Sequence, residues 1–540
     1  MADRHTDTRQ WGGKVTNRKQ RRPCGWLLSA VTGAALLLGS CAALAGGQVF
    51  ETNVTHDLNL SSGEPEIAVD PRNPRHLAII EFAVGSAEKP ASTFNFNDYP
   101  EYAHDLAGAL GNSSRVDIST DGGNKWSVTT LAVFFVAHGQ RYGGGDPYIA
   151  YGPHGEIYAG GEIGAPPRSG SGTGQAAEST SGVAIAVSVD GGRTFSPQQS
   201  AGTPIDRPWL TVDESTGTLY SVSSGPYNVH TGQHNVRGPD APNDRWLVAW
   251  KPRLAGKSRP RRLGGPDFSA SAGSTIAAAH GVVAATFVLG GPRPGGGFFG
   301  RAVGPTPLPA SLRGITPASV TSCSMQQPCL YFETSTDEGR HWTRHYISTP
   351  GGFNPHRANV SADPGRVGRF AVAVLNPQSS GFLVFVTDDD GRTWSGPATV
   401  PESAQGADFK QWMAYGPTGV LGLVWKKQRN DFGPAPQQPP HAPREVVGPG
   451  FDVYSAISCD GGLTWLAPVR VNSVTSPPGP AGSDDLAYIA LGPHDADMVW
   501  GDRRHLHDVH NAGYAAGGLQ AYFARVPFSV FSHGAVCGRH

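Results

Sequence analysis

A short apolar phrase recurs seven times along the chain, and most copies close on Asp-Pro or Gly-Pro. The copies are Pro65–Pro71, Pro147–Pro153, Pro208–Asp213, Ser274–Ala278, Ala358–Pro364, Gln411–Pro417 and Ala487–Pro493. Short apolar runs bounded by turn residues are typical of strands. Their spacing of roughly 70 residues indicates one supersecondary unit that is repeated along the chain. We therefore predict seven repeats, each containing this phrase as a strand.

A second pattern, Ser-x-Asp-Gly-Gly-x-Thr-Trp, recurs with small changes downstream of most of these phrases. The copies are Ser119–Trp126, Ser188–Phe195, Ser335–Trp342, Thr387–Trp394 and Ser458–Trp465. The Asp can accept hydrogen bonds from backbone N–H groups of its own turn. The second Gly can adopt positive φ, and the final aromatic side chain gives the turn an apolar plug. Apolar alternation before most copies, as in Val183–Val187, predicts that each motif links two antiparallel strands.

These turn motifs resemble the Asp-box, or bacterial neuraminidase repeat, and the chain resembles the sialidase-like β-propellers from about residue 60 to residue 530. The resemblance implies an all-β fold, a closed ring of four-stranded antiparallel blades. It also implies that the boxes lie at the blade periphery as staples of the fold, away from a central site.

Spacing between the motifs gives the number of blades. The Asp residues of the boxes stand at 121, 190, 337, 389 and 460, so the second interval is long enough for two units with one box lost. The lost box falls near Trp246–Pro252, where a strand ends without Asp-Gly. Seven apolar phrases favour seven blades, and six, the number in true sialidases, is the alternative.

The first 45 residues have the pattern of an export leader. Arg18, Lys19, Arg21 and Arg22 precede an apolar run, Trp26–Leu38, that is too short for a comfortable membrane span. Leu38–Cys41 resembles a lipobox, which would attach a lipid to Cys41, whereas Ala43–Ala45 fits ordinary signal peptidase. We expect an exported protein, either a cell-surface lipoprotein or a freely secreted one, with a single propeller domain over residues 46–535.

Composition agrees with an exported globular protein. The formal net charge is −1 and the pI is near 7.0, which argues against a nucleic-acid-binding surface. Cys323 and Cys329 are close enough in sequence to form a small disulfide, and Cys459 could pair with Cys537 to fix the tail. We expect a monomer that meets the membrane only through a lipid on Cys41.

Charged and aromatic residues stand at or just before the apolar phrases, where they would converge on the central channel. Candidates for catalysis are Glu64, Glu66, Asp146, Tyr148 and Asp206. Candidates for substrate binding are Arg141, Arg207, Trp209, Arg357, Asp408, Trp412 and Arg503. Any one of these residues could instead cap a loop or tie two blades together.

Glycoside hydrolysis would use these residue types. It needs a proton-donating carboxyl group and a nucleophile or base on the other face of the sugar. The resemblance to sialidases implies a Tyr nucleophile, here Tyr148 or Tyr488, beside a Glu, with Asp146 or Asp206 as acid and base. It also implies an arginine clamp for a sugar carboxylate, for which Arg207, Arg357 and Arg503 are candidates. The sequence departs from sialidases at Gly63–Ile67, where their Arg-Ile-Pro motif is missing.

Three function classes follow from these observations. We favour an exported, sialidase-like glycoside hydrolase that acts on terminal sugars, sialic acid or another glycan residue. The alternatives are a non-catalytic surface propeller that binds glycan or protein, and an assembly factor of the cell envelope. None of the three requires a cofactor or a metal, although carboxylates around a narrow channel could hold Ca²⁺.

Overall fold

The computed structural model describes residues 48–57, 60–85, 113–130, 141–142, 146–164, 180–201, 209–228, 233–234, 243–251, 256–257, 261–263, 275–290, 305–401, 406–429, 431, 447–480, 487–505, 519–532 and 537. All of these residues belong to the unit Gly46–His540. The predicted leader, residues 1–45, lies outside the described residues, so its processing stays a prediction.

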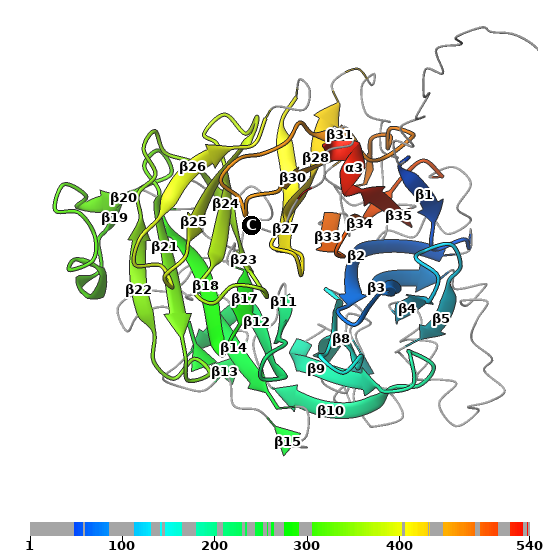
Figure 1. Cartoon of the computed structure of the whole chain (residues 1–540). Helices are drawn as coiled ribbons and strands as arrows, with labels where there is room; N and C mark the ends of the chain where they lie inside the picture. Colours follow the sequence, from blue (N-terminus) through cyan, green and yellow to red (C-terminus); the bar gives the residue numbers. More distant parts are fainter. Residues whose placement is uncertain are drawn as a thin grey trace, which may run out of the picture. The chain divides into compact units, whose positions relative to one another are not determined.

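Seven antiparallel sheets, each built on four strands, follow one another along the chain and surround a common centre (Figure 1). Blade 1 contains β2 (Leu60–Asp70), β3 (Asn73–Gly85), β4 (Ser113–Ser119) and β5 (Ser127–Thr130). Blade 2 contains β7 (Tyr148–Tyr151), β8 (Ile157–Gly164), β9 (Thr180–Ser188) and β10 (Ser196–Ala201). Blade 3 contains β11 (Trp209–Asp213), β12 (Thr218–Asn228), β14 (Asn243–Trp250) and β16 (Arg261–Arg262).

The other four blades repeat this order of strands. Blade 4 contains β17 (Ile276–Ala279), β18 (Val282–Leu289), β21 (Cys329–Ser335) and β22 (Thr343–Ile347). Blade 5 contains β23 (Asn354–Ala362), β24 (Phe370–Leu375), β25 (Phe382–Thr387) and β26 (Ser395–Thr399). Blade 6 contains β27 (Asp408–Tyr415), β28 (Leu421–Arg429), β30 (Gly450–Ser458) and β31 (Val469–Arg470). Blade 7 contains β33 (Ala487–Leu491), β34 (Asp495–Asp502), β35 (Gln520–Pro527) and β1 (Phe50–Asn53).

Short elements decorate this ring. They are β6 (Arg141–Tyr142), β13 (Gln233–His234), β15 (Gly256–Lys257), the pair β19 (Thr306–Pro307) and β20 (Ser322–Cys323), the pair β29 (Val447–Gly448) and β32 (Gly479–Pro480), the 3₁₀ turn η4 (Ala310–Leu312) and the single-turn helix α3 (Phe528–Phe531). No helix within the described residues is long and apolar enough to cross a membrane.

The seven apolar phrases form the innermost strands of the seven blades, as the sequence predicted. The prediction of seven blades is confirmed, and the alternative of six is wrong. The second strand of a blade is covered by neighbouring blades, and in blade 4 all eight residues of β18 are buried. The fourth strand meets solvent, and no residue of β26 is buried.

The ring closes by pairing the two ends of the chain. Strand β1 pairs antiparallel with β35, with Phe50 opposite Arg525 and Asn53 opposite Tyr522. The fourth strand of blade 7 therefore comes from the N-terminal part of the chain. No turn joins the third and fourth strands of this blade, which explains why its unit has no Asp-box motif.

The five repeated turns share one pattern of hydrogen bonds. In the Ser458–Trp465 turn, the Ser458 hydroxyl lies 2.7 Å from Asp460 Oδ1, which also accepts from the backbone N–H groups of Leu463 and Thr464 at 3.1 and 2.9 Å. The N–H of Gly462 donates to Ser458 Oγ, and the φ of this glycine is 107°. Equivalent bonds hold the turns at Asp121, Asp190, Asp337 and Asp389. The predicted chemistry of the turn is confirmed.

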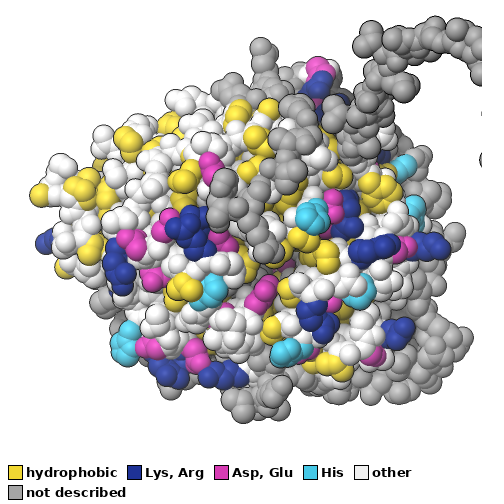
Figure 2. Space-filling model, in the orientation of Figure 1, with side chains coloured by type: hydrophobic (Ala, Val, Ile, Leu, Met, Phe, Trp, Pro, Cys, Tyr) yellow, Lys and Arg dark blue, Asp and Glu magenta, His cyan; other side chains and the backbone are white. Residues whose placement is uncertain are grey.

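Both predicted cysteine pairs are bonded. Cys323 and Cys329 close a small loop beside β21, and Cys459 in the turn of blade 6 is joined to Cys537 near the C-terminus. On the face drawn in Figure 2, acidic and basic side chains are interspersed, which agrees with the net charge of −1.

Candidate functional site

One position is equivalent in all seven blades: the residue immediately before the first aliphatic residue of the inner phrase. We call these seven residues the channel layer. They are Glu66, Tyr148, Trp209, Thr275, Asn359, Trp412 and Tyr488. Two of them make the same bond to the next blade. Glu66 Oε2 accepts from the N–H of Ile149 at 3.3 Å, and Thr275 Oγ1 accepts from the N–H of Val360 at 2.8 Å.

Three aromatic side chains of the layer meet across the channel. The rings of Trp412 and Tyr488 stack with their centroids 4.0 Å apart, and Trp209 lies 5.0 Å from Trp412. Trp209 and Tyr488 are each only 5% exposed. Trp209 and Trp412, predicted as sugar platforms, are thus brought together, but they pack against each other within the described structure.

Glu66 is the buried carboxyl group of the layer. It is 3% exposed, it hydrogen-bonds to Tyr488, and its Oε1 makes no well-formed hydrogen bond to any described residue. Burial raises the pKa of Glu66 well above its usual value, and the negative charge of Asp146 adds to this. The hydrogen bonds from Tyr488 and Ile149 act in the opposite direction but are weaker. Glu66 is therefore a buried carboxyl group whose pKa lies above that of an exposed glutamate.

A second set of residues stands two positions before each channel-layer residue in the sequence, and we call it the charged ring. Its charged members are Glu64, Asp146, Arg207, Arg357 and Lys410. Glu64, Asp146 and Lys410 have φ values of 48°, 42° and 57°, in the left-handed region that non-glycine residues rarely adopt. The inner strands of blades 1, 5 and 6 have register shifts at this position. Such local strain is often found at functional sites.

The acidic members of the charged ring are in contact. The N–H of Asp146 donates to Glu64 Oε2 at 3.1 Å, and Asp146 is close enough to Glu66 to raise its pKa. Glu64, Glu66 and Asp146, three of the predicted catalytic residues, are therefore gathered at the junction of blades 1 and 2. Tyr488 completes this cluster from blade 7.

Other predicted site residues lie elsewhere. Tyr148 is fully buried in a core cluster with Val183 and Val248. Asp408 is also buried, and its Oδ1 lies 2.9 Å from the Lys427 ammonium. Arg503 is fully buried, with its guanidinium 5.8 Å from the centroid of the Phe451 ring.

Four predicted residues cannot be placed by their side chains. Arg141 lies in β6, opposite Gly164, and Arg357 lies in β23, but their side chains fall outside the described part of the chain. Asp206 and Arg207 themselves lie outside the described residues. The roles of all four stay predictions.

Two sets of buried polar groups were not predicted. Asn359 is 1% exposed, and neither its Oδ1 nor its Nδ2 has a hydrogen-bond partner among the described residues. Lys426 and Lys427 are both fully buried in β28. Asn359 could have been found from the sequence, because it is a polar residue inside an apolar phrase. The pairing of Lys427 with Asp408 depends on the fold.

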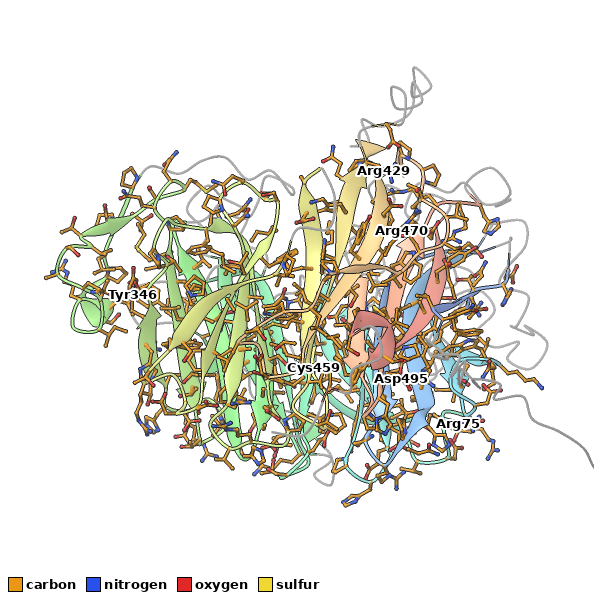
Figure 3. All side chains as sticks on the ribbon, turned by 45° about the horizontal axis from the view of Figure 1, so that its top comes forward. Arg75, Tyr346, Arg429, Cys459, Arg470 and Asp495 are labelled. Carbon is orange, nitrogen blue, oxygen red and sulfur yellow. A yellow bond between two sulfur atoms is a disulfide. The ribbon has the colours of Figure 1, made fainter. Side chains whose placement is uncertain are left out.

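Arg429 and Arg470 lie towards the same end of blade 6, whereas Cys459 lies further along it (Figure 3). Both arginines bind Asp452, at 2.6 and 2.8 Å. Buried Asp452 thereby balances two cations, and we read this cluster as structural. Within the described residues, no three metal-ligating side chains are grouped so that they could hold an ion.

The chain was compared with known families, curated proteins and solved structures. No model of a known family matches the sequence, and a search of curated proteins finds no match either. The fold is similar to a protein of unknown function from Dyadobacter fermentans, with 10% identity, a TM-score of 0.40, and coverage of 89% of this chain and 99% of that one.

Two glycosidases also have a similar fold. The Hadza microbial sialidase Hz136 shares 12% identity over 78% of this chain and 74% of its own, with a TM-score of 0.39. The GH93 α-L-arabinofuranosidase of Fusarium graminearum shares 13% identity over 70% of this chain and 93% of its own, with a TM-score of 0.38. The likeness is one of fold. The seven blades and their shared turns bear out the resemblance to sialidase-like propellers at the level of the fold.

Proposed function

We propose that this protein is an exported, sialidase-like glycoside hydrolase that acts on a terminal sugar where the inner strands begin. The observation that carries the proposal is the cluster of Glu66, Tyr488, Glu64 and Asp146, in which burial raises the pKa of Glu66. Many glycosidases use two neighbouring carboxyl groups, one of which has a raised pKa.

The division of charge around the ring suggests the finer substrate. Glu64 belongs to blade 1, and Asp146 precedes the inner strand of blade 2; of the basic members, Arg357 and Lys410 belong to blades 5 and 6, and Arg207 stands two residues before β11 in the sequence. An anionic sugar would direct its carboxylate to the basic side and its glycosidic bond to the acidic side. This arrangement favours a sialic-acid-like substrate over a neutral sugar.

The reaction would proceed in two displacements. Tyr488 attacks the anomeric carbon and gives its proton to ionised Glu66, while Asp146 protonates the departing oxygen as the glycosidic bond breaks. Water then attacks the same carbon and passes a proton to Asp146. The bond between this carbon and the Tyr488 oxygen breaks, and Tyr488 takes its proton back from Glu66. A base works best when its pKa is near the working pH, and burial moves the pKa of Glu66 in that direction.

Hydrolysis of aryl glycosides by the purified protein tests the proposal. We expect turnover of an aryl sialoside, and Glu66→Gln should lower kcat by about 10²–10⁴-fold. Glu338→Gln, in a peripheral turn, should leave it unchanged. Lys410→Ala should raise KM for the sialoside but not for a neutral aryl glycoside. Absence of turnover on every glycoside would refute the proposal.

A non-catalytic surface propeller is the second candidate, and the aromatic stack favours it. Trp209 and Tyr488 are almost fully buried by each other and by Trp412, which leaves little of their ring faces for a sugar. Retention on a glycan array without release of sugar would favour this function.

We also propose that the protein works outside the cytoplasm. The predicted leader would export it, and the two disulfides suit an oxidising compartment. Whether Cys41 carries a lipid is a separate question, which labelling of cells with a radioactive fatty acid would answer.

A further inference from the structure

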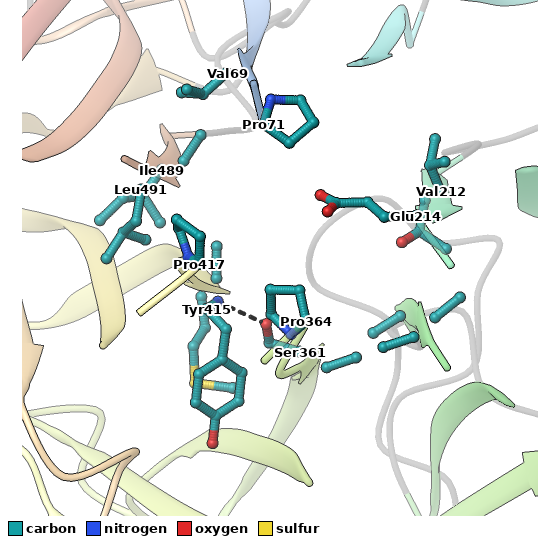
Figure 4. A pocket seen from close by; sticks show the side chains of 18 of the residues that line it. Val69, Pro71, Val212, Glu214, Ser361, Pro364, Tyr415, Pro417, Ile489 and Leu491 are labelled. Carbon is teal, nitrogen blue, oxygen red and sulfur yellow. Dashed lines mark hydrogen bonds between the residues drawn. The ribbon is translucent and has the colours of Figure 1, made fainter. Parts of the chain in front are cut away.

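A cavity of about 280 Å³ lies in the channel between the channel layer and the far end of the inner strands. Glu66, Trp412 and Tyr488 line it at the channel layer. The turns after the inner strands, with Pro71, Pro364 and Pro417, form its mouth (Figure 4). Glu66 and Tyr488 belong both to this cavity and to the proposed catalytic cluster, whereas Glu214 and the turns at the mouth belong to the cavity alone.

The walls of the cavity are aliphatic and its two ends are acidic. Ile67, Leu210, Ile276, Val360 and Ile489 supply the walls. No Lys or Arg belongs to the described residues that line it. A narrow space with apolar walls and carboxyl groups concentrates a negative potential, which favours a cation.

The mouth carries the carboxylate of Glu214, which points into the open centre of the cavity in Figure 4. The neighbouring Asp213 is occupied by its own turn and by the N–H of Gly281 at 2.7 Å. Asp70 is likewise held by Arg72 and His76. Glu214 is thus the carboxylate that can meet a ligand at this end.

The inner end carries Glu66, whose Oε1 lacks a well-formed hydrogen bond to a described residue although the side chain is 97% buried. A buried carboxyl oxygen without a donor is costly, and a ligand that supplied an N–H group would relieve that cost. The rings of Trp412 and Tyr488 also line this end of the cavity.

The spacing of the two ends limits the length of the ligand. Five residues of strand separate Trp209 in the layer from Glu214, which is about 16 Å at about 3.3 Å per residue. The two glutamate side chains take up part of this length. An aliphatic diamine of about four to six carbons would span the rest. We propose that this cavity is a binding site for a linear α,ω-diaminoalkane, with one ammonium group at Glu214 and the other at Glu66.

Calorimetric titration of the whole protein tests the site with 1,5-diaminopentane as the probe and n-pentylamine as the singly charged control. We expect one diamine per chain, bound at least about tenfold more tightly than the monoamine. Glu214→Gln should weaken diamine binding to the monoamine level, whereas Glu338→Gln, a matched change outside the cavity, should not.

The inference is overturned by equal affinity for diamine and monoamine, or by binding that Glu214→Gln leaves unchanged. Absence of binding at millimolar diamine would overturn it as well. Glu214 is at the surface, so its variant should fold normally, which the melting temperature of the apoprotein verifies. Each result is independent of the hydrolysis assay, so failure of one proposal is distinguishable from failure of the other.

Discussion

Three residues of the charged ring have backbone conformations that glycine would adopt at a lower cost in free energy. Glu64, Asp146 and Lys410 all have positive φ, and such strain costs on the order of 1–3 kcal/mol per residue. They occupy one equivalent position in three blades, so the strained backbone is a repeated feature of the propeller. This repetition adds to the reasons for proposing a function where the inner strands begin.

Another buried cluster, near the ring closure, stabilises the fold and should respond to pH. Arg115 is shared by two fully buried carboxylates, at 2.8 Å from Glu81 and 2.7 Å from Asp117. Burial raises the pKa of Glu81, although the charge of Arg115 opposes this, and the nearby negative Asp117 adds to the rise. One guanidinium thus faces two acids, and protonation of Glu81 relieves their repulsion.

The sign of the pH effect follows from this raised pKa. Folded Glu81 binds its proton more tightly than unfolded Glu81, whose pKa is about 4.5. Its contribution to stability is therefore present at low pH and is lost as the pH rises through the folded value. We expect Glu81→Gln to reduce the fall in unfolding free energy between pH 5 and pH 7. Urea titrations at both pH values would measure this, and an unchanged difference would contradict it.

At the scale of strands and turns, sequence periodicity was sufficient for most of the fold. The inner phrases and the turn motifs depend on contacts within a few residues, so their pattern is readable along the chain. Contacts between blades are not readable in this way. Tyr148 and Tyr488 hold the same place in their phrases, yet Tyr148 packs into a core and Tyr488 reaches Glu66.

The same limit applies to the candidate site. Asp408 looked like a ligand-binding carboxylate, but its partner Lys427 comes from the next strand, and only the register of β27 with β28 brings them together. Trp209 and Trp412 were recognised as aromatic residues of the channel, but their mutual contact depends on how blades 3 and 6 face each other. Position along a strand was predictable, whereas side-chain partners across the ring were not.

The repeated turn gives a prediction at this scale. Asp460→Ala removes the acceptor of two backbone bonds and of the Ser458 and Thr464 hydroxyl bonds. We expect a loss of roughly 1–3 kcal/mol in unfolding free energy. Leu463→Ala, an exposed position of the same turn, is the control and should have little effect. Equal losses for the two variants would mean that the Asp bonds do not stabilise the turn.

At the scale of the whole molecule, stability depends on where the ring is closed. Strand β1 joins blade 7 through its pairing with β35, and Glu51 accepts from Arg504 at 2.6 Å and from the N–H of Ser473 at 2.8 Å. Phe50 adds an edge-to-face contact with Phe523. These contacts connect residues more than 400 positions apart, so they restrain the ring as a whole.

Removal of this strand should open the ring without destroying any single blade's inner strands. A protein that begins after Asn53 would leave β35 with a free edge and Arg504 without Glu51, whose carboxylate also helps to hold Ser473. We expect its melting midpoint to fall by roughly 5–10 °C, because several kcal/mol of contacts are lost together. A protein that begins at Phe50 keeps the strand and is the matched control. If both truncations melt at the same temperature, β1 does not restrain the ring, and closure must depend on the packing of blades 7 and 1 alone.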